Sequence, residues 1–114
     1  MAALLGAVTA RYGKLVRDRI PEIIENAGKK ASYASLDDAG FRKALVAKLI
    51  EEAREVAEAS GEERLSELAD LAEVLDATLA AHGFTTTDLQ QRRARRNAER
   101  GAFVRRIYLE SVDE

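Results

Sequence analysis

The chain has 114 residues and a mass of 12.5 kDa, which suits a single domain with a modest core. Hydrophobic residues make up 46% and charged residues 33%, as in soluble globular proteins, and a net charge of −2 argues against general binding to nucleic acids or anionic membranes. There is no cysteine, and His82 is the only histidine. A disulfide framework, a thiolate metal site and a histidine-rich zinc site within one chain are therefore excluded.

The first residues, 1–10, are small and mostly apolar, but no basic region precedes them and they are too short to span a membrane; the leader is taken as residues 1–11. We expect a disordered or loosely packed leader in a cytoplasmic protein, with a signal peptide as the alternative. A single helical domain is expected over residues 12–110, followed by a polar tail at residues 111–114.

Helix start and stop signals predict a mainly α fold of about four helices. Pro21 suits the first turn of a short helix, and Gly28 stops that helix. Asp37 or Asp38 then caps a long helix that runs to about Ser60.

Two further helices are predicted in the second half of the chain. The third follows the turn at Ser60-Gly61 and runs to about His82. The fourth begins at Thr85 or Thr86 in a capping-box arrangement and ends at Gly101. Its apolar residues are too few for a deeply buried helix.

Two segments outside the helices alternate polar and apolar residues. They are residues 31–36 and residues 102–109, and each is predicted to form a strand. Because each is the only available partner for the other, we expect a small two-stranded ribbon at one end of the helical bundle.

The two long helices carry acidic residues near apolar stripes. In the first, Glu52 lies in the middle of a stripe and Glu55 lies at its edge; the stripe consists of Phe41, Leu45, Leu49, Val56 and Ala59. In the second, Glu67 and Asp70 lie on another side from the predicted core stripe, in line with Val74, Ala77 and Ala81. That core stripe consists of Leu65, Leu68, Ala72, Leu75 and Leu79, with Leu71 on its shoulder.

Two pairs of acids on adjacent antiparallel helices suggest a shared counter-ion. Burying a carboxylate costs several kcal/mol unless it is paired or bound to a cation. A hard divalent cation, Mg²⁺ or Mn²⁺, is the natural candidate because it prefers oxygen ligands. On the alternative interpretation the acids are solvated and have helical partners, Lys48 for Glu52 and Arg64 for Glu67.

The spacing of these acids resembles a family signature. Glu51-Glu52-x-x-Glu55, an eleven-residue gap and Glu67-x-x-Asp70 match the EExxE…ExxD pattern of the all-α nucleoside triphosphate pyrophosphohydrolases. This MazG-like group includes phosphoribosyl-ATP pyrophosphohydrolase. The resemblance extends over residues 12–109 through the flanking stretches at residues 14–21, 48–49, 100–103 and 106–107.

The resemblance implies a metal-dependent hydrolase that cleaves the α,β-phosphoanhydride of a nucleotide to a monophosphate and pyrophosphate, in the upkeep of the nucleotide pool. The expected ligands of Mg²⁺, or of Mn²⁺, are Glu52, Glu55, Glu67 and Asp70. Glu51 is adjacent to these ligands in the sequence but lies on a different side of the helix. It is the candidate for orienting or deprotonating the attacking water. Glu51 and Glu52 are therefore the expected catalytic residues.

Basic residues are the candidates for binding phosphate groups. Lys14, Arg17 and Arg19 precede the first helix, and Lys48 precedes the acids. On the last helix, Arg93, Arg96 and Arg100 share one face, with Asn97 beside them. A nucleic-acid patch is disfavoured because aromatic residues do not interleave with these arginines.

Three alternatives remain open from the sequence. The substrate could be phosphoribosyl-ATP, the chain could bind a nucleotide without cleaving it, or it could be a non-catalytic helical module whose arginine helix binds an acidic partner. Two-sided apolarity of residues 65–81, with the dimers or tetramers typical of the family, predicts a homo-oligomer that completes the bundle.

Overall fold

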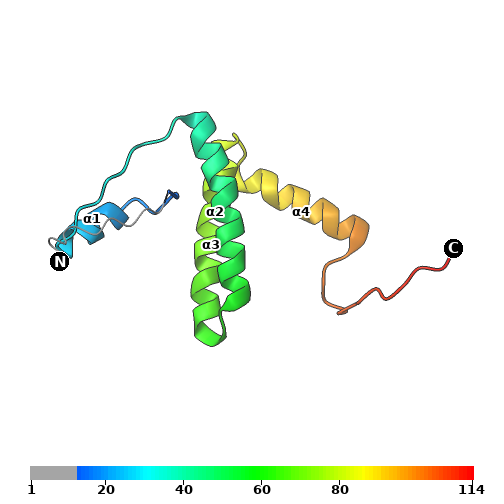
Figure 1. Ribbon diagram of the computed structural model, residues 1–114. Coiled ribbons are helices and arrows are strands. Elements are labelled where there is room, and N and C mark those ends of the chain that lie inside the picture. The colour runs from blue at the N-terminus through cyan, green and yellow to red at the C-terminus, as the bar shows by residue number, and fades with distance from the viewer. Residues whose placement is uncertain (1–12) are drawn as a thin grey trace.

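The structure is a computed structural model that describes residues 13–114, and the predicted leader at residues 1–11 lies outside this range. The described part is mainly helical, as predicted. It contains α1 (Ile20–Asn26), α2 (Asp38–Glu58), α3 (Gly61–Ala81) and α4 (Thr86–Arg100). Figure 1 shows α2 and α3 as an antiparallel hairpin, with α1 on one side and α4 projecting from the other.

The predicted helix starts are confirmed by their capping hydrogen bonds. The Asp37 carboxylate accepts a hydrogen bond of 2.8 Å from the Gly40 N–H at the start of α2. At the start of α4, the Thr85 N–H donates to the Asp88 carboxylate at 2.8 Å, and the Asp88 N–H donates to the Thr85 hydroxyl at 3.0 Å. Such a cap contributes about 1 kcal/mol because it satisfies amide groups at the helix end that lack helical partners.

The turn between α2 and α3 is closed by an arginine. Gly61 has a φ of 55°, in the left-handed region that favours glycine. The Arg64 guanidinium donates to the Val56 carbonyl at 3.1 Å and to the Ala59 carbonyl, so it satisfies acceptors at the end of α2. Arg64 therefore binds these carbonyls. It does not pair with Glu67, as expected on the alternative interpretation in which the acids are solvated (the surface-acid interpretation).

The predicted β ribbon is wrong for the described residues, where no strand forms. Residues 31–36 connect α1 to α2 on one side of the hairpin, while residues 102–114 continue beyond α4 on the other side (Figure 1). The second segment also turns back at Arg106, which has a φ of 57°. Alternation alone could not form the ribbon, because the two segments lie too far apart to exchange hydrogen bonds.

The core lies between α2 and α3, and on α2 it follows the predicted stripe. Leu45, Glu52 and Ala59 are buried along this stripe. Its other members, Phe41, Leu49 and Val56, are half-buried.

The predicted core face of α3 is wrong for four of its five stripe residues. Leu65, Leu68 and Leu75 are exposed, as is Ala72. The half-buried residues of α3 are instead Glu67, Asp70, Leu71, Val74, Ala77, Thr78, Leu79 and Ala81, which include Leu79 of the predicted stripe and Leu71 on its shoulder. Because α3 is apolar on two sides, periodicity alone did not distinguish the inner side from the outer one. The consequence is that the acids of α3 turn toward those of α2.

Candidate metal centre

Carboxylates from α2 and α3 converge in the middle of the hairpin. One oxygen each from Glu51, Glu52 and Glu55 lie within 4.8 Å of one another, and the same holds for Glu52, Glu67 and Asp70. Glu52 belongs to both trios and so stands at the centre. All five acids selected from the sequence are brought together, although Glu67 and Asp70 lie on a helix face that was not expected to be buried.

Among the described residues, Glu52 is the one charged residue that is buried, with 5% of its surface exposed. Lys48 approaches one carboxylate oxygen to 3.5 Å, as the surface-acid interpretation expected. Glu52 Oε2 and Glu67 Oε2, however, are buried without a hydrogen-bond partner in the part of the chain that the structure describes. An unsatisfied buried acceptor costs about 1–3 kcal/mol, and more when it is charged. Solvated surface acids would not carry this cost.

The surroundings shift the pKa values of these acids in opposite directions. Burial raises the pKa of Glu52, and the adjacent Glu55 carboxyl raises it further. The pKa of Glu67 is also raised, by burial and then by Glu55 and the neighbouring acids. Burial opposes ionisation of Glu51 as well, but hydrogen bonds from Lys48 and Lys14 outweigh it and lower the pKa of Glu51. The centre therefore combines two carboxyl groups whose ionisation is disfavoured, Glu52 and Glu67, with one whose ionisation is favoured, Glu51.

Three of the predicted phosphate-binding residues lie at the edge of the cluster. Lys14 and Lys48 donate to Glu51 Oε2 at 3.3 and 3.2 Å. Arg17 donates to the Asp70 carboxylate at 2.7 Å, and this hydrogen bond raises the pKa of Arg17. The segment before α1 thus contacts both α2 and α3, and it places the side chains of Lys14 and Arg17 beside the acids.

The other predicted phosphate-binding residues are not brought to the cluster within one chain. Arg19 is paired with Glu22 on α1 at 3.0 Å. The four candidates on α4 are all exposed on a helix that projects away from the hairpin (Figure 1); they are Arg93, Arg96, Asn97 and Arg100. Helical spacing predicts a common face for the three arginines but carries no information on the direction of α4.

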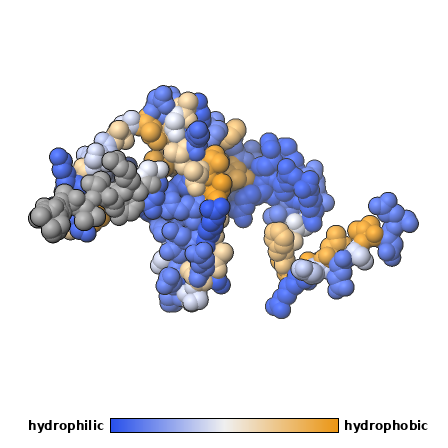
Figure 2. All heavy atoms as spheres, in the orientation of Figure 1, coloured by the Kyte–Doolittle hydropathy of each residue, from blue (hydrophilic) through white to orange (hydrophobic). Residues whose placement is uncertain are grey.

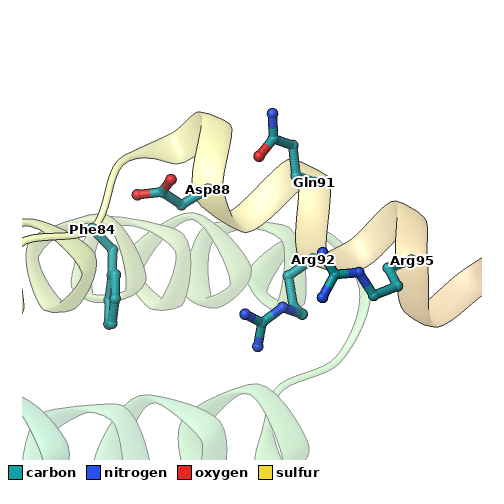
Figure 3. A pocket seen from close by; sticks show the side chains of 5 residues that line it. All are labelled: Phe84, Asp88, Gln91, Arg92 and Arg95. Atoms are coloured by element: carbon teal, nitrogen blue, oxygen red, sulfur yellow. The ribbon is translucent and has the colours of Figure 1, made fainter.

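A hollow of about 300 Å³, apart from the acidic cluster, lies along α4 and the connection that precedes it. Figure 3 shows the Phe84 ring and the Arg92 side chain reaching toward the same side, with Asp88, Gln91 and Arg95 along α4. Sequence reasoning missed this set because it considered a different face of α4. Residues 88, 91, 92 and 95 recur at helical spacing, which is the signal that could have identified it. The hollow shares no residue with the acidic cluster.

The donor set of the cluster fits a hard divalent cation. All the available ligand atoms are carboxylate oxygens, which suit Mg²⁺ and Mn²⁺. The two orphaned oxygens belong to residues from both helices, so a cation between α2 and α3 would satisfy both. Glu52, Glu55, Glu67 and Asp70 are therefore the residues that could hold it.

No family model matches the chain, and neither a curated protein nor a solved structure matches it. The likeness to the pyrophosphohydrolases accordingly rests on the motif itself. Among the described residues, no helix is long and apolar enough to cross a membrane.

Proposed function

We propose that the chain is a metal-dependent nucleotide pyrophosphohydrolase of the MazG-like kind, which cleaves the α,β-phosphoanhydride of a nucleoside triphosphate to a monophosphate and pyrophosphate. The observation that carries this proposal is the buried Glu52 carboxylate, shared by two trios of acids and left with an unsatisfied oxygen. A purely structural hairpin would gain stability from an apolar residue at this position.

Glu52, Glu55, Glu67 and Asp70 would hold Mg²⁺, or Mn²⁺ in its place. The chemistry that such an ion supplies, when bound, is neutralisation of the negative charge on phosphate oxygens. Asp70 is held by Arg17 in the structure. The Arg17 guanidinium beside it would bind phosphate oxygens of the substrate, for which its planar fork of donors is suited.

Glu51 would act as the base that orients and deprotonates the attacking water. The lowered pKa of Glu51 favours the ionised form, which accepts hydrogen bonds and so suits the orienting role more than strong basicity. Both lysine contacts are made to Oε2, so its other carboxylate oxygen is the one we assign to the water. Lys14 and Lys48 would bind phosphate oxygens beside it.

The active form is proposed to be a homo-oligomer, a dimer or tetramer. The outer face of α3 exposes Leu65, Leu68 and Leu75, and α2 adds Val46 and Ile50 beside it. The Cα radius of gyration is 19.8 Å, whereas a compact domain of this length has about 13 Å. Pairing of two such hairpins would complete a four-helix bundle.

The test is pyrophosphate release from a panel of ribo- and deoxynucleoside triphosphates and phosphoribosyl-ATP, with and without Mg²⁺ or Mn²⁺. Glu52→Gln should lower the metal-dependent rate by about 100-fold or more, because it removes a shared ligand. Glu58→Gln is the matched control on an exposed part of α2 outside both trios and should retain activity. Equal rates for the two variants, or release without added metal after chelation, would refute the proposal.

Phosphoribosyl-ATP is in the panel because the acidic cluster does not distinguish it from a nucleoside triphosphate. Release from phosphoribosyl-ATP alone would assign the narrower activity of the same centre. Failure with every substrate would favour the helical module, for which the exposed arginines of α4 would be the binding surface.

A further inference from the structure

The C-terminal arm, residues 102–112, carries large apolar side chains that nothing in the described part of the chain covers. Each of them is at least 71% exposed, and Phe103 is 96% exposed; the others are Val104, Ile107, Tyr108, Leu109 and Val112. Figure 2 shows these apolar atoms as a band along the arm, beyond the polar surface of α4. Exposed apolar patches of this kind mark interaction sites, and the rest of the chain offers a surface that the arm would fit.

A groove of matching character lies on the hairpin. It has a volume of about 340 Å³ and lies where α2, α3 and the α3–α4 connection meet; its lining residues are Val46, Leu75, Thr78, Leu79, His82 and Phe84. Figure 2 shows apolar atoms gathered at this end of the hairpin, beside the first turn of α4. Leu75 joins the groove to the exposed leucines further along α3.

The two surfaces also carry opposite charge. α3 has six acidic residues and one arginine. The arm, residues 102–112, has two arginines, Arg105 and Arg106, and one acidic residue, Glu110. Charge complementarity of this kind steers two surfaces together and fixes their register.

The arm does not reach its own groove in the structure. α4 is a 15-residue helix, about 22 Å long, and it holds the arm at the end farthest from the groove (Figure 1). The chain exposes 10105 Å², whereas a compact folded protein of 12.5 kDa exposes about 6,200 Å². The excess is larger than the roughly 1,000–2,500 Å² that each subunit contributes to an obligate interface, so each chain has surface to spare for one.

We infer that the C-terminal arm of one copy occupies the groove of a second copy, with reciprocal exchange of the two arms. Every chain carries one arm and one groove, so a twofold exchange satisfies both and closes. A partner of another sequence would leave one of the two surfaces exposed on each chain. The inference rests on the proposed homo-oligomer and adds that the C-terminal arm is a segment that holds its subunits together.

The experiment uses single-cysteine variants of the full chain, which contains no cysteine of its own. Chains with Ile107→Cys and chains with Leu75→Cys are co-expressed with tags of different mass and treated with a short bis-maleimide cross-linker. The expected product is a covalent heterodimer of the two chains. Glu25→Cys, on the exposed side of α1, replaces Leu75→Cys in the control and should give no heterodimer with Ile107→Cys.

A double variant that carries both Ile107→Cys and Leu75→Cys distinguishes exchange from folding back. Cross-links between chains support the exchange, whereas cross-links only within one chain would overturn it. An oligomer in sedimentation without either cross-link would also overturn it while leaving the homo-oligomer standing. Because no nucleotide or metal is present, the outcome is independent of the proposed hydrolysis.

Association strength gives a second readout. Ile107→Asp should raise the dissociation constant of the oligomer by about 30-fold or more, as for a residue at the centre of an interface. Tyr33→Asp is the control, since both side chains are 71% exposed and Tyr33 lies outside the arm. Equal dissociation constants for the two variants would contradict the inference.

Discussion

Glu52 shows most clearly how a residue type and its position determine a site. Its place in the apolar stripe of α2 was evident from the sequence, and its burial is confirmed. The orientation of Glu67 was not evident, because α3 has two apolar sides and the larger leucines suggested the wrong one. Side-chain size misled here, since the side with smaller residues packs against α2 and carries the acids inward.

The raised pKa values of Glu52 and Glu67 make a prediction for the metal-free protein. A raised pKa in the folded state stabilises the fold below the unfolded-state pKa, and this contribution is lost as pH rises through the folded-state pKa. We expect the chelated wild type to lose thermal stability as the pH rises from the ordinary pKa of a glutamate, about 4.3, towards neutral. Glu51, whose pKa is lowered, acts in the opposite sense and reduces the effect.

The measurement is the Tm across this range in the presence of a chelator, for the wild type and for Glu52→Gln. The variant should show the weaker loss of Tm, because it lacks one of the two raised groups. Glu58→Gln should follow the wild type. A wild-type Tm that rises steadily over the range would contradict the assignment of raised pKa values.

At the scale of the elements, the helices were predictable and the strands were not. Helix starts and stops depend on local groups, such as Asp37 and the Thr85–Asp88 pair, which the sequence displays directly. A strand depends on a distant partner, and residues 31–36 and 102–109 lie on opposite sides of the hairpin (Figure 1). Alternation in the sequence could not reveal that separation.

Arg64 is expected to stabilise the α2–α3 turn. Arg64→Ala removes its hydrogen bonds to the Val56 and Ala59 carbonyls and should lower the free energy of unfolding by about 1–2 kcal/mol. Urea denaturation measures this loss. Arg54→Ala, on an exposed position of α2, is the control and should stay within about 0.5 kcal/mol of the wild type. A loss of the same size in both variants would mean that the turn contacts contribute nothing specific.

At the scale of the whole molecule, one chain leaves much of its apolar surface uncovered. The direction of α4 and the exposure of the arm depend on contacts that no local pattern encodes, so the predicted phosphate-binding role of Arg93 and Arg96 depends on a direction of α4 that the sequence does not encode. In one chain these arginines lie away from the cluster. Any contact between these arginines and the acidic cluster would therefore be made between chains of the proposed oligomer.

The outer face of α3 is expected to be an interface. Leu68→Asp should convert the native oligomer to a single chain, because it introduces a charge into the centre of that face. Light scattering after size-exclusion chromatography gives the mass. Leu36→Asp, similarly exposed but on the connection before α2, should leave the mass unchanged. A wild type with the mass of one chain would contradict the proposed homo-oligomer.

The most direct measurement is calorimetric titration of the metal-free protein with Mg²⁺ and with Mn²⁺, for the wild type, Glu52→Gln and Glu58→Gln. The wild type and Glu58→Gln should bind with micromolar to millimolar affinity, whereas Glu52→Gln should bind at least about tenfold more weakly because it removes the carboxylate shared by both trios. Equal binding by all three proteins, or no binding by any of them, would contradict the assignment of the hairpin acids as a metal centre.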